Sequence, residues 1–378
     1  MLLTAREAAA RLGIKLDTLY AYVSRGRLRS VAAIASRERR YDSDEVDALA
    51  APRGGTPPPA GEALQPLIES SICLIEDGRL YYRGDDAIRL SDTASLEDVA
   101  ALLWQTEIAA VPPPLATASL PRKRARDSVG AGAGLGLIER CQVRLAEMSC
   151  RDAAALDLDA AAVAPAGSAI LDALTACVAE NAKTSGPIHR RLAAAWRLDD
   201  TGADIVRRCL VLLADHELNA STLAARVVAS TGATPYMAVS AALGALSGAR
   251  HGGLSSRVEA LFHEAKASGD AISAMAERLI RGDDLPGIGH PLYPQGDPRA
   301  VAILYALSLV APQARRLVGR QPNVDFALGA TSVVLGLPQG SALGLFLVAR
   351  SVGWIAHAIE QYESGVLIRP RARYTGRR

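Results

Sequence analysis

The spacing of apolar positions along the chain predicts helices far more often than strands. Apolar residues recur at helical spacing over residues 300–310, and alanine-rich stretches of the same kind fill most of residues 131–208. A helix is also predicted over residues 95–104, where a serine and an aspartate three residues later form a capping box. Strand spacing is clear at residues 72–83, where an Asp-Gly pair separates two short apolar segments as a hairpin turn does. The pattern therefore predicts an all-α protein with little sheet.

Residues 1–50 have a pattern of their own. Thr4 and Glu7 form a capping box at the start of a first short helix, and residues 16–24 have the spacing of a second helix. Residues 37–41 predict a strand or wing, and a closing helix follows them. This order resembles the helix-turn-helix of the MerR and excisionase-like DNA-binding domains.

Basic residues gather in this unit, as contacts to DNA phosphates require. They are Lys15, Arg25, Arg27, Arg29, Arg37, Arg39 and Arg40. Asp17 and the acidic residues within 42–47 reduce the positive charge of this patch. Two functions are therefore open for residues 1–50: weak binding of duplex DNA, or a helical module that docks or dimerises. Residues 51–60, with three consecutive prolines, predict a linker to the rest of the chain.

Composition narrows the class of protein. A chain of 378 residues should hold more than one domain, and a net charge of +2 creates no global field for nucleic acid or membrane. Five dispersed cysteines without metal-type spacing predict buried, reduced thiols, no metal site and a cytoplasmic location. We find no signal-peptide pattern and no uninterrupted apolar run long enough to span a bilayer.

The segment at residues 287–299 offers the clearest chemistry. Glycines flank Ile288 and three prolines exclude a regular helix, so His290 lies on a constrained loop. Asp297 is expected to cap the next helix, which places Arg299 in the first turn, where a cation opposes the helix dipole. An imidazole and a guanidinium from one rigid loop can bind a carbonyl oxygen and a carboxylate together. The alternative is a structural loop with a satisfied histidine.

Five further stretches carry polar residues in a fixed order around this loop. They occupy residues 215–222, 244–253, 323–329, 349–357 and 367–374. Together with the loop, their order and spacing resemble the citrate synthase family from about residue 68 to the C-terminus. The resemblance is weakest between residues 105 and 208.

The resemblance implies the joining of an acyl thioester's methyl carbon to a ketone. That reaction needs a base for a weakly acidic C–H, a neutral donor at the enol oxygen, and an acid at the acceptor carbonyl. By resemblance, Asp325 is the base, His251 the donor and His290 the acid. No permanently bound cofactor is implied, because acetyl-CoA or another short acyl-CoA is a co-substrate.

The acceptor, oxaloacetate, is a dicarboxylate and needs several cations. Arg299, Arg350 and Arg369 match the carboxylate ligands of the family, and His216 matches a further oxaloacetate contact. The family takes the arginine at the Arg369 position from the neighbouring subunit, which implies an obligate homodimer with composite active sites.

Each residue also has an ordinary structural explanation. His251 could end a helix, Asp325 could be a helix N-cap, and Arg350 could be a solvated or salt-bridged side chain. His216 could belong to an ion-paired surface group, and His357, on an amphipathic helix, is expected to be structural. Their joint occurrence at the positions that the family requires favours an intact condensing site.

One departure from the family concerns coenzyme A. Pro291 and Pro294 stand where many members have basic residues near the coenzyme A phosphates, and Arg250, Arg371 and Arg373 are candidates to replace them. The acyl donor is therefore open. Citrate synthase is the first hypothesis, 2-methylcitrate synthase acting on propionyl-CoA is the near alternative, and a metabolite-sensing DNA-binding regulator is the third.

The resemblance also sets the expected domains. A large synthase domain should comprise residues 61–253 and 337–378, and a small synthase domain residues 254–336. Their facing residues would enclose the substrates in a cleft that closes and excludes water.

Overall fold

The structure is a computed structural model of the chain. It describes residues 2–12, 19, 23, 30–32, 39–43, 46, 68–106, 134–180, 185–266, 269–283, 285–318 and 321–376. The chain divides into two compact units, Met1–Leu67 and Ile68–Arg378.

The first unit contains a small antiparallel sheet and a helix. Strands β1 (Leu2–Thr4), β3 (Arg39–Asp42) and β2 (Ser30–Ala32) lie in that order, and α1 (Ala5–Leu12) follows β1 directly. The predicted capping box is confirmed, since Thr4 N donates to Glu7 Oε2 over 2.7 Å and Glu7 N donates to Thr4 Oγ1 over 3.3 Å. The wing is confirmed as β3, whereas β1 and β2 were not predicted.

Other expectations for this unit lie largely outside the described residues. These are most of the second helix at 16–24, most of the closing helix at 43–50, the 51–60 linker and the basic residues Lys15, Arg25, Arg27, Arg29 and Arg37. Within the described part, Leu3, Ala8, Leu19, Tyr41 and Val46 form a buried core. This core joins the strands to the helices of the unit.

The second unit is mostly helical, so the predicted all-α class is confirmed. It begins with β4 (Cys73–Glu76), β5 (Arg79–Tyr82) and β6 (Asp85–Asp86), and continues with α4 (Ala87–Thr93), α5 (Leu96–Trp104), α6 (Leu137–Ser149), η1 (Ala153–Leu156), α7 (Ala160–Val178) and α8 (Ile188–Ala195). It then contains α9 (Asp200–Leu213), α10 (Ala220–Ala229), α11 (Pro235–Leu246), α12 (Gly253–Lys266), α13 (Ala271–Arg281), α14 (Pro298–Leu307), η2 (Pro312–Ala314), α15 (Arg315–Val318), α16 (Val324–Val334) and α17 (Ser341–Ser364).

Short sequence patterns in this unit predicted a hairpin and two helices at nearly the positions where the structure has them. The hairpin forms around the Asp77-Gly78 pair, with Ile75 opposite Leu80, although the third strand β6 was not predicted. The Ser95–Asp98 capping box at α5 is confirmed. The helix predicted for residues 300–310 is α14, which ends three residues earlier at Leu307.

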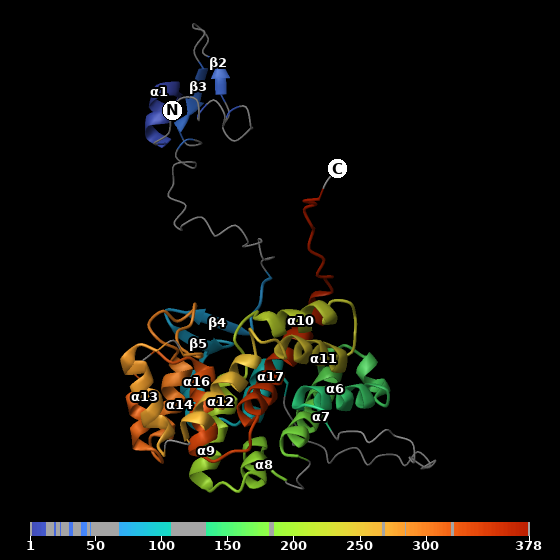
Figure 1. The fold of residues 1–378 in the computed structure, drawn as a ribbon. Helices are drawn as coiled ribbons and strands as arrows, with labels where there is room; N and C mark the ends of the chain where they lie inside the picture. The colour runs from blue at the N-terminus through green and yellow to red at the C-terminus, as the bar shows by residue number, and fades with distance from the viewer. Residues whose placement is uncertain are drawn as a thin grey trace. The chain divides into compact units, whose positions relative to one another are not determined.

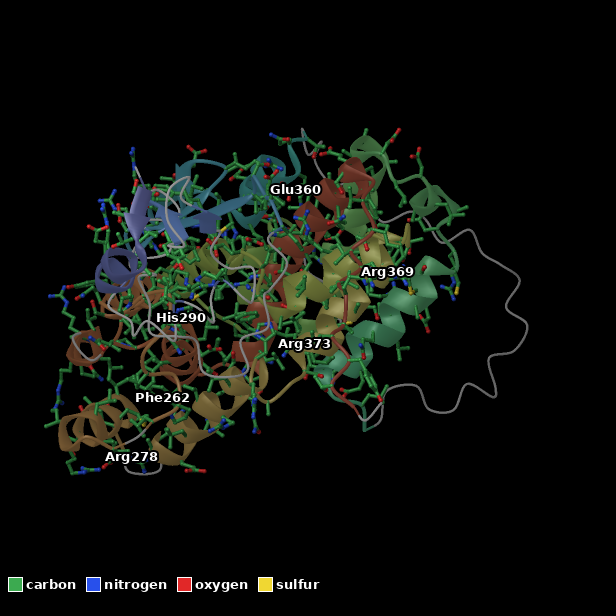
Figure 2. All side chains as sticks on the ribbon, turned by 90° about the horizontal axis from the view of Figure 1, so that it is seen from above. Phe262, Arg278, His290, Glu360, Arg369 and Arg373 are labelled. Atoms are coloured by element: carbon green, nitrogen blue, oxygen red, sulfur yellow. The ribbon has the colours of Figure 1, made fainter. Side chains whose placement is uncertain are left out.

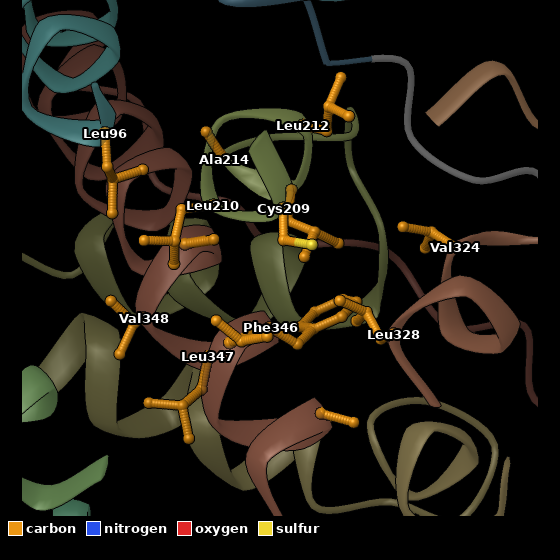
Figure 3. Packing of buried hydrophobic residues seen from close by; sticks show 14 of the residues in the cluster. Leu96, Cys209, Leu210, Leu212, Ala214, Val324, Leu328, Phe346, Leu347 and Val348 are labelled. Atoms are coloured by element: carbon orange, nitrogen blue, oxygen red, sulfur yellow. The ribbon is translucent and has the colours of Figure 1, made fainter. Parts of the chain in front are cut away.

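Helix α17 is the centre of the second unit. Figure 1 shows α13, α14 and α16 on one side of it, and α6 and α7 on the other. Phe346, Leu347 and Val348 of α17 pack against Leu210 and Cys209 of α9 in a continuous core (Figure 3). The expectation of an amphipathic helix here was wrong, because packed elements cover nearly every face of α17.

Two further expectations need correction. Helices α7 and α17 are long and apolar enough to cross a membrane by length and composition alone, each with a mean hydropathy of 1.6. The apolar window of α17 is 94% buried inside the protein, which identifies it as a core helix, and that of α7 is 56% buried. All five cysteines are free, but only Cys141 and Cys209 are buried, whereas Cys73 and Cys177 are partly buried and Cys150 is exposed.

Helices α12 and α16 approach each other at a glycine. A β-carbon on Gly329 of α16 would lie 2.7 Å from Val258 Cγ1 and 3.0 Å from Phe262 Cδ2, both on α12. The first distance is shorter than real β-carbon contacts, and the second is tighter than most of them. The spacing of these two helices therefore depends on the absence of a side chain at Gly329.

We expect Gly329→Ala to lower the free energy of unfolding by about 1–3 kcal/mol, because the added methyl group overpacks the α12–α16 contact. Gly244→Ala on α11 is the matched control, since its β-carbon would meet only Gln142 Nε2 at 3.7 Å. Denaturant unfolding of both variants measures the difference. Equal stability of the two variants would contradict the account of this contact.

Candidate active site

The turn after α9 lies directly against α17. Arg350 Nε donates to the Leu213 carbonyl over 2.8 Å, and Gly353 N donates to the Ala214 carbonyl over 3.0 Å. A β-carbon on Gly353 would come within 2.5 Å of that Ala214 oxygen and would also collide with the Asp215 carboxylate. Only glycine at this position allows the turn to approach the helix so closely.

The β4–β5 hairpin holds the same turn from another side. The Tyr82 hydroxyl lies 3.1 Å from each of two carbonyls at the C-terminal end of α9, and Ile75 N donates to Glu217 Oε1 over 3.1 Å. Asp215 Oδ1 accepts from Glu217 N over 3.0 Å, and Glu217 has a left-handed backbone with φ of 51°. The backbone that presents His216 is therefore fixed on both sides.

Three rings meet where this turn faces the loop at residues 287–299. His216 Nε2 lies 3.0 Å from the Tyr293 hydroxyl, and the His216 and His290 rings meet edge to face with centroids 5.2 Å apart. Leu292 N donates to His290 Nδ1 over 3.1 Å, so the neutral His290 ring carries its proton on Nε2. His216 is 7% exposed, which overturns the surface ion-pair explanation.

Both of these imidazoles are held in the neutral form. Burial lowers the pKa of His216 well below its ordinary value, and the positive charges of Arg299 and Arg350 lower it further. Burial and Arg299 also lower the pKa of His290, against the opposing effect of Asp297. At pH 7 each ring therefore donates only one hydrogen bond.

Asp297 and Arg299 form a buried, side-on ion pair. Arg299 Nε and Nη2 donate to Asp297 Oδ1 and Oδ2 over 2.9 and 2.8 Å, and the two residues are 2% and 1% exposed. Asp297 Oδ2 also accepts from Val324 N over 3.0 Å, which joins the start of α14 to the start of α16. The predicted N-cap is confirmed, and the Asp297 carboxylate explains how a cation is held in the first turn.

Asp325 lies in the first turn of α16. The N-cap there is Asn323, whose Oδ1 accepts from Asp325 N over 3.1 Å, so the N-cap explanation for Asp325 was wrong. Burial raises the pKa of Asp325, while a hydrogen bond from Ser255 Oγ and the positive charge of Arg299 oppose the rise. A carboxylate in this setting is more basic than one in water.

His251 lies in the glycine-rich turn between α11 and α12. Its Nε2 is 2.8 Å from Ser221 Oγ, which also accepts from Trp354 Nε1 over 3.2 Å. Burial lowers the pKa of His251 to about 4, and the charge of Arg350 contributes. His251 is therefore a third neutral imidazole.

Arg350 is the electrostatic centre of this group. It is 1% exposed and its guanidinium lies 4.8 Å from the centre of the Phe346 ring. Its charge acts on His216, His251 and Asp325. Burial and the charge of Arg299 lower the pKa of Arg350, against the opposing effect of Asp215. The explanation of Arg350 as a solvated side chain was wrong.

The remaining predicted residues do not join this group within one chain. Arg369, Arg371 and Arg373 are exposed on the segment after α17, which runs away from the helices in Figure 1. Figure 2 shows Arg369 and Arg373 well apart from His290. Arg250 is exposed in the turn before His251.

Sequence reasoning missed several residues that hold the group together. They are Ser221, Ser255, Tyr293 and Gly353. Tyr293 could have been noticed, because it lies between two prolines of the loop that carries His290. Gly353 gives no local signal, since its partner Ala214 is distant in the sequence.

A separate hollow of about 510 Å³ is lined by the ends of α7, α10 and α17. Its lining contains Asp159 and Glu363 but no histidine or arginine, so its charges disfavour a dicarboxylate.

Among the residues that the structure describes, no group of three or more His, Cys, Asp or Glu side chains is placed to hold a metal ion.

Comparison with known proteins identifies the family. The family model for the citrate synthase C-terminal domain matches residues 64–371, and the model of a helix-turn-helix domain matches residues 2–53. The chain therefore belongs to the citrate synthase family and carries an N-terminal helix-turn-helix domain.

Individual relatives agree with this assignment. The chain is 40% identical over 192 residues to a citrate synthase of Haloferax volcanii, and 35% identical over 193 residues to 2-methylcitrate synthase 1 of Corynebacterium glutamicum. The matched segments cover 46% of this chain in both cases, and the chain spans about half the length of these relatives, 50% and 51%.

Solved structures extend the likeness of fold over most of the second unit. The citrate synthase of Thermotoga maritima has a TM-score of 0.62 at 25% identity, with 84% of this chain and 94% of that chain covered. A citrate synthase of Thermoplasma acidophilum, solved in ternary complex with carboxymethyl coenzyme A and oxaloacetate, has a TM-score of 0.64 at 24% identity, with 82% of this chain and 94% of that chain covered.

We expect Asp297→Asn to lower the free energy of unfolding by about 3 kcal/mol at pH 7, because it leaves the Arg299 charge buried without its partner. Burial alone would raise the pKa of Asp297, but Arg299 lowers it below its ordinary value. The pair therefore stabilises the fold above about pH 4 and this contribution is lost as the pH falls through the folded-state pKa.

Denaturant unfolding at pH 7 and at about pH 3 checks this expectation. The loss of unfolding free energy in Asp297→Asn should be complete at pH 7 and smaller at about pH 3. Asp283→Asn is the control, since Asp283 pairs with Arg281 on the exposed surface. A deficit that stays constant with pH would contradict the assigned ion pair.

Proposed function

We propose that the protein condenses acetyl-CoA with oxaloacetate to give citrate and free coenzyme A. The observation that carries this proposal is the group around Arg350: Asp325 with a raised pKa, and His216, His251 and His290 with lowered pKa values. Forming an enol and adding it to a ketone needs one basic carboxylate and neutral donors in a buried site. Family membership supports the same reaction class.

Asp325 is the proposed base. Its carboxylate removes a proton from the methyl carbon of the acyl thioester, and its raised pKa makes it a better proton acceptor than an exposed aspartate. The Ser255 hydroxyl donates to Oδ1, which orients the carboxylate and leaves Oδ2 to take the proton.

His251 is the proposed donor to the enol oxygen. Ser221 Oγ donates to Asn219 Oδ1 over 2.8 Å and also lies 2.8 Å from His251 Nε2. We propose that this hydroxyl turns its proton to His251 Nε2 when the acyl thioester binds, so that the ring proton lies on Nδ1 and stabilises the enol oxygen.

His290 and the arginines are the proposed oxaloacetate site. His290 carries its proton on Nε2 and can donate it to the ketone oxygen. Arg299 uses Nε and Nη2 for Asp297, which leaves Nη1 for a substrate carboxylate, and Arg350 and His216 complete the contacts. Coenzyme A contacts are proposed for Arg250, Arg371 and Arg373.

The exposed arm after α17 supports a composite site in a homodimer. Arg369 does not join the group of its own chain, so we propose that it enters the site of a second copy. Residues 61–253 with 337–378 and residues 254–336 are the proposed large and small domains, with His290 and Asp325 on the small one. A cytoplasmic location is proposed from the five free cysteines.

The test of the proposed function is release of free thiol from acetyl-CoA that depends on oxaloacetate. We expect Asp325→Asn to lower kcat by about 10²–10⁴-fold while oxaloacetate still binds, because the base is lost and the arginines remain. Asp283→Asn is the control and should keep full turnover. Near-native turnover by the Asp325 variant would exclude it as the base.

Thiol release from propionyl-CoA in the same assay tests the alternative function, that of a 2-methylcitrate synthase. The similarity to 2-methylcitrate synthase 1 of Corynebacterium glutamicum supports that alternative. One methylene changes binding by about 1–3 kcal/mol, so faster thiol release from propionyl-CoA would assign 2-methylcitrate synthase.

The helix-turn-helix match at residues 2–53 favours a second function, DNA binding by a metabolite-sensing regulator. We expect the full chain to retain duplex DNA weakly, with retention falling steeply as salt rises. A chain starting at Gly61 should lose this retention and keep its thiol release. Equal DNA retention by both chains would remove the role from the N-terminal unit.

A further inference from the structure

His357 has no role in the reaction proposed above, yet it is completely buried in α17. Arg226 Nη1 lies 3.1 Å from its Nδ1. A guanidinium nitrogen can only donate, so Nδ1 must accept, and the ring proton lies on Nε2. His357 Nε2 donates a long hydrogen bond of 3.5 Å to Asp215 Oδ1 and lies 3.3 Å from Asp215 Oδ2, which accepts no hydrogen bond.

Arg226 is fixed in turn by acceptors from α17. It is 2% exposed, its Nε donates to Gln361 Oε1 over 2.9 Å, and its Nη1 pairs with the Glu360 carboxylate. Burial raises the pKa of Glu360, but the Ser71 N–H and the Arg226 guanidinium outweigh it and lower that pKa. The His357 ring therefore lies between a cation that only donates and a carboxylate that accepts.

The carboxylate at the other end controls the turn that carries His216. Asp215 is completely buried, and its Oδ1 accepts from Glu217 N, so it ties together the residues on both sides of His216. Gly353, four residues before His357 on α17, brings the helix against the same carboxylate. Within the described residues, the His357 N–H is the side-chain donor placed to hold Asp215 from α17.

We propose that His357, kept in its Nε2-protonated form by Arg226, is a positioning residue for His216. It holds the Asp215 carboxylate, and Asp215 sets the turn from which His216 reaches Tyr293 and the substrate. The part of this inference that concerns oxaloacetate rests on the proposed function. The part that concerns the ring proton and the turn does not.

Nitrogen NMR of ring-labelled histidine tests the part that is independent of activity, since the chain has only six histidines. At pH 7 the signals of wild-type His357 should show a bare Nδ1 and a protonated Nε2. A ring protonated on Nδ1 would overturn the proposal, and this result needs no variant.

Variants then test the link to His216. His357→Leu removes both ring nitrogens and should shift the His216 signals, whereas His357→Gln keeps a donor that can reach Asp215 and should restore them towards wild type. His189→Leu on α8 is the control, because His189 is partly buried outside this network. Unchanged His216 signals in a folded His357→Leu variant would overturn the positioning role.

Kinetics test the part that rests on the proposed function. His357→Leu should raise the KM for oxaloacetate about tenfold with a smaller change in kcat, and His357→Gln should recover most of the loss. An unchanged KM in the Leu variant would overturn the effect on substrate. Absence of thiol release by the wild type would instead reject the proposed function and leave the NMR result to decide the rest.

Discussion

At Gly353 the backbone of α17 lies against the turn after α9, and any side chain there would occupy the space of the Asp215 carboxylate. Three positions on one face of α17 contact three consecutive residues of this turn, through Arg350, Gly353 and His357. The turn carries His216 and the helix carries Arg350. The close approach therefore sets the relative positions of two side chains that the proposed function requires.

Charge balance is the second condition that this buried site must meet. Burying the charges of Arg299 and Arg350 without nearby carboxylates would destabilise the fold. Asp297 pairs directly with Arg299, and the charge of Asp215 acts on Arg350. The same positive charges, together with burial, keep the histidines neutral. An anionic substrate would enter a site whose cations are already oriented, which reduces the cost of reorganisation on binding.

Features that depend on near neighbours could be predicted from the sequence. The Thr4–Glu7 and Ser95–Asp98 capping boxes and the Asp-Gly hairpin involve residues no more than a few positions apart. The identities of the site residues came from the resemblance to a family, and the structure brings His216, His251, His290, Asp325, Arg299 and Arg350 into one group.

The way these residues are held could not be predicted. The His216–Tyr293 contact spans 77 residues and the Arg350–Leu213 contact spans 137, so no local spacing reveals them. The burial of α17 on nearly every face was also missed, because the sequence predicted an amphipathic helix, which has one solvent-exposed face. Arg369 lies outside the group for a different reason, since its proposed partner is a second copy of the chain.

Calorimetric titration of oxaloacetate into Gly353→Ala and Gly344→Ala proteins tests the central claim most directly. Both changes add a methyl group to a crowded position of α17, but a β-carbon on Gly344 would meet Val178 Cγ1 at 2.8 Å, away from the α9 turn. If the α9 turn sets the site, Gly353→Ala should weaken binding at least about tenfold, or about 1.4 kcal/mol, while Gly344→Ala binds like wild type. Equal affinities in the two variants would contradict the claim.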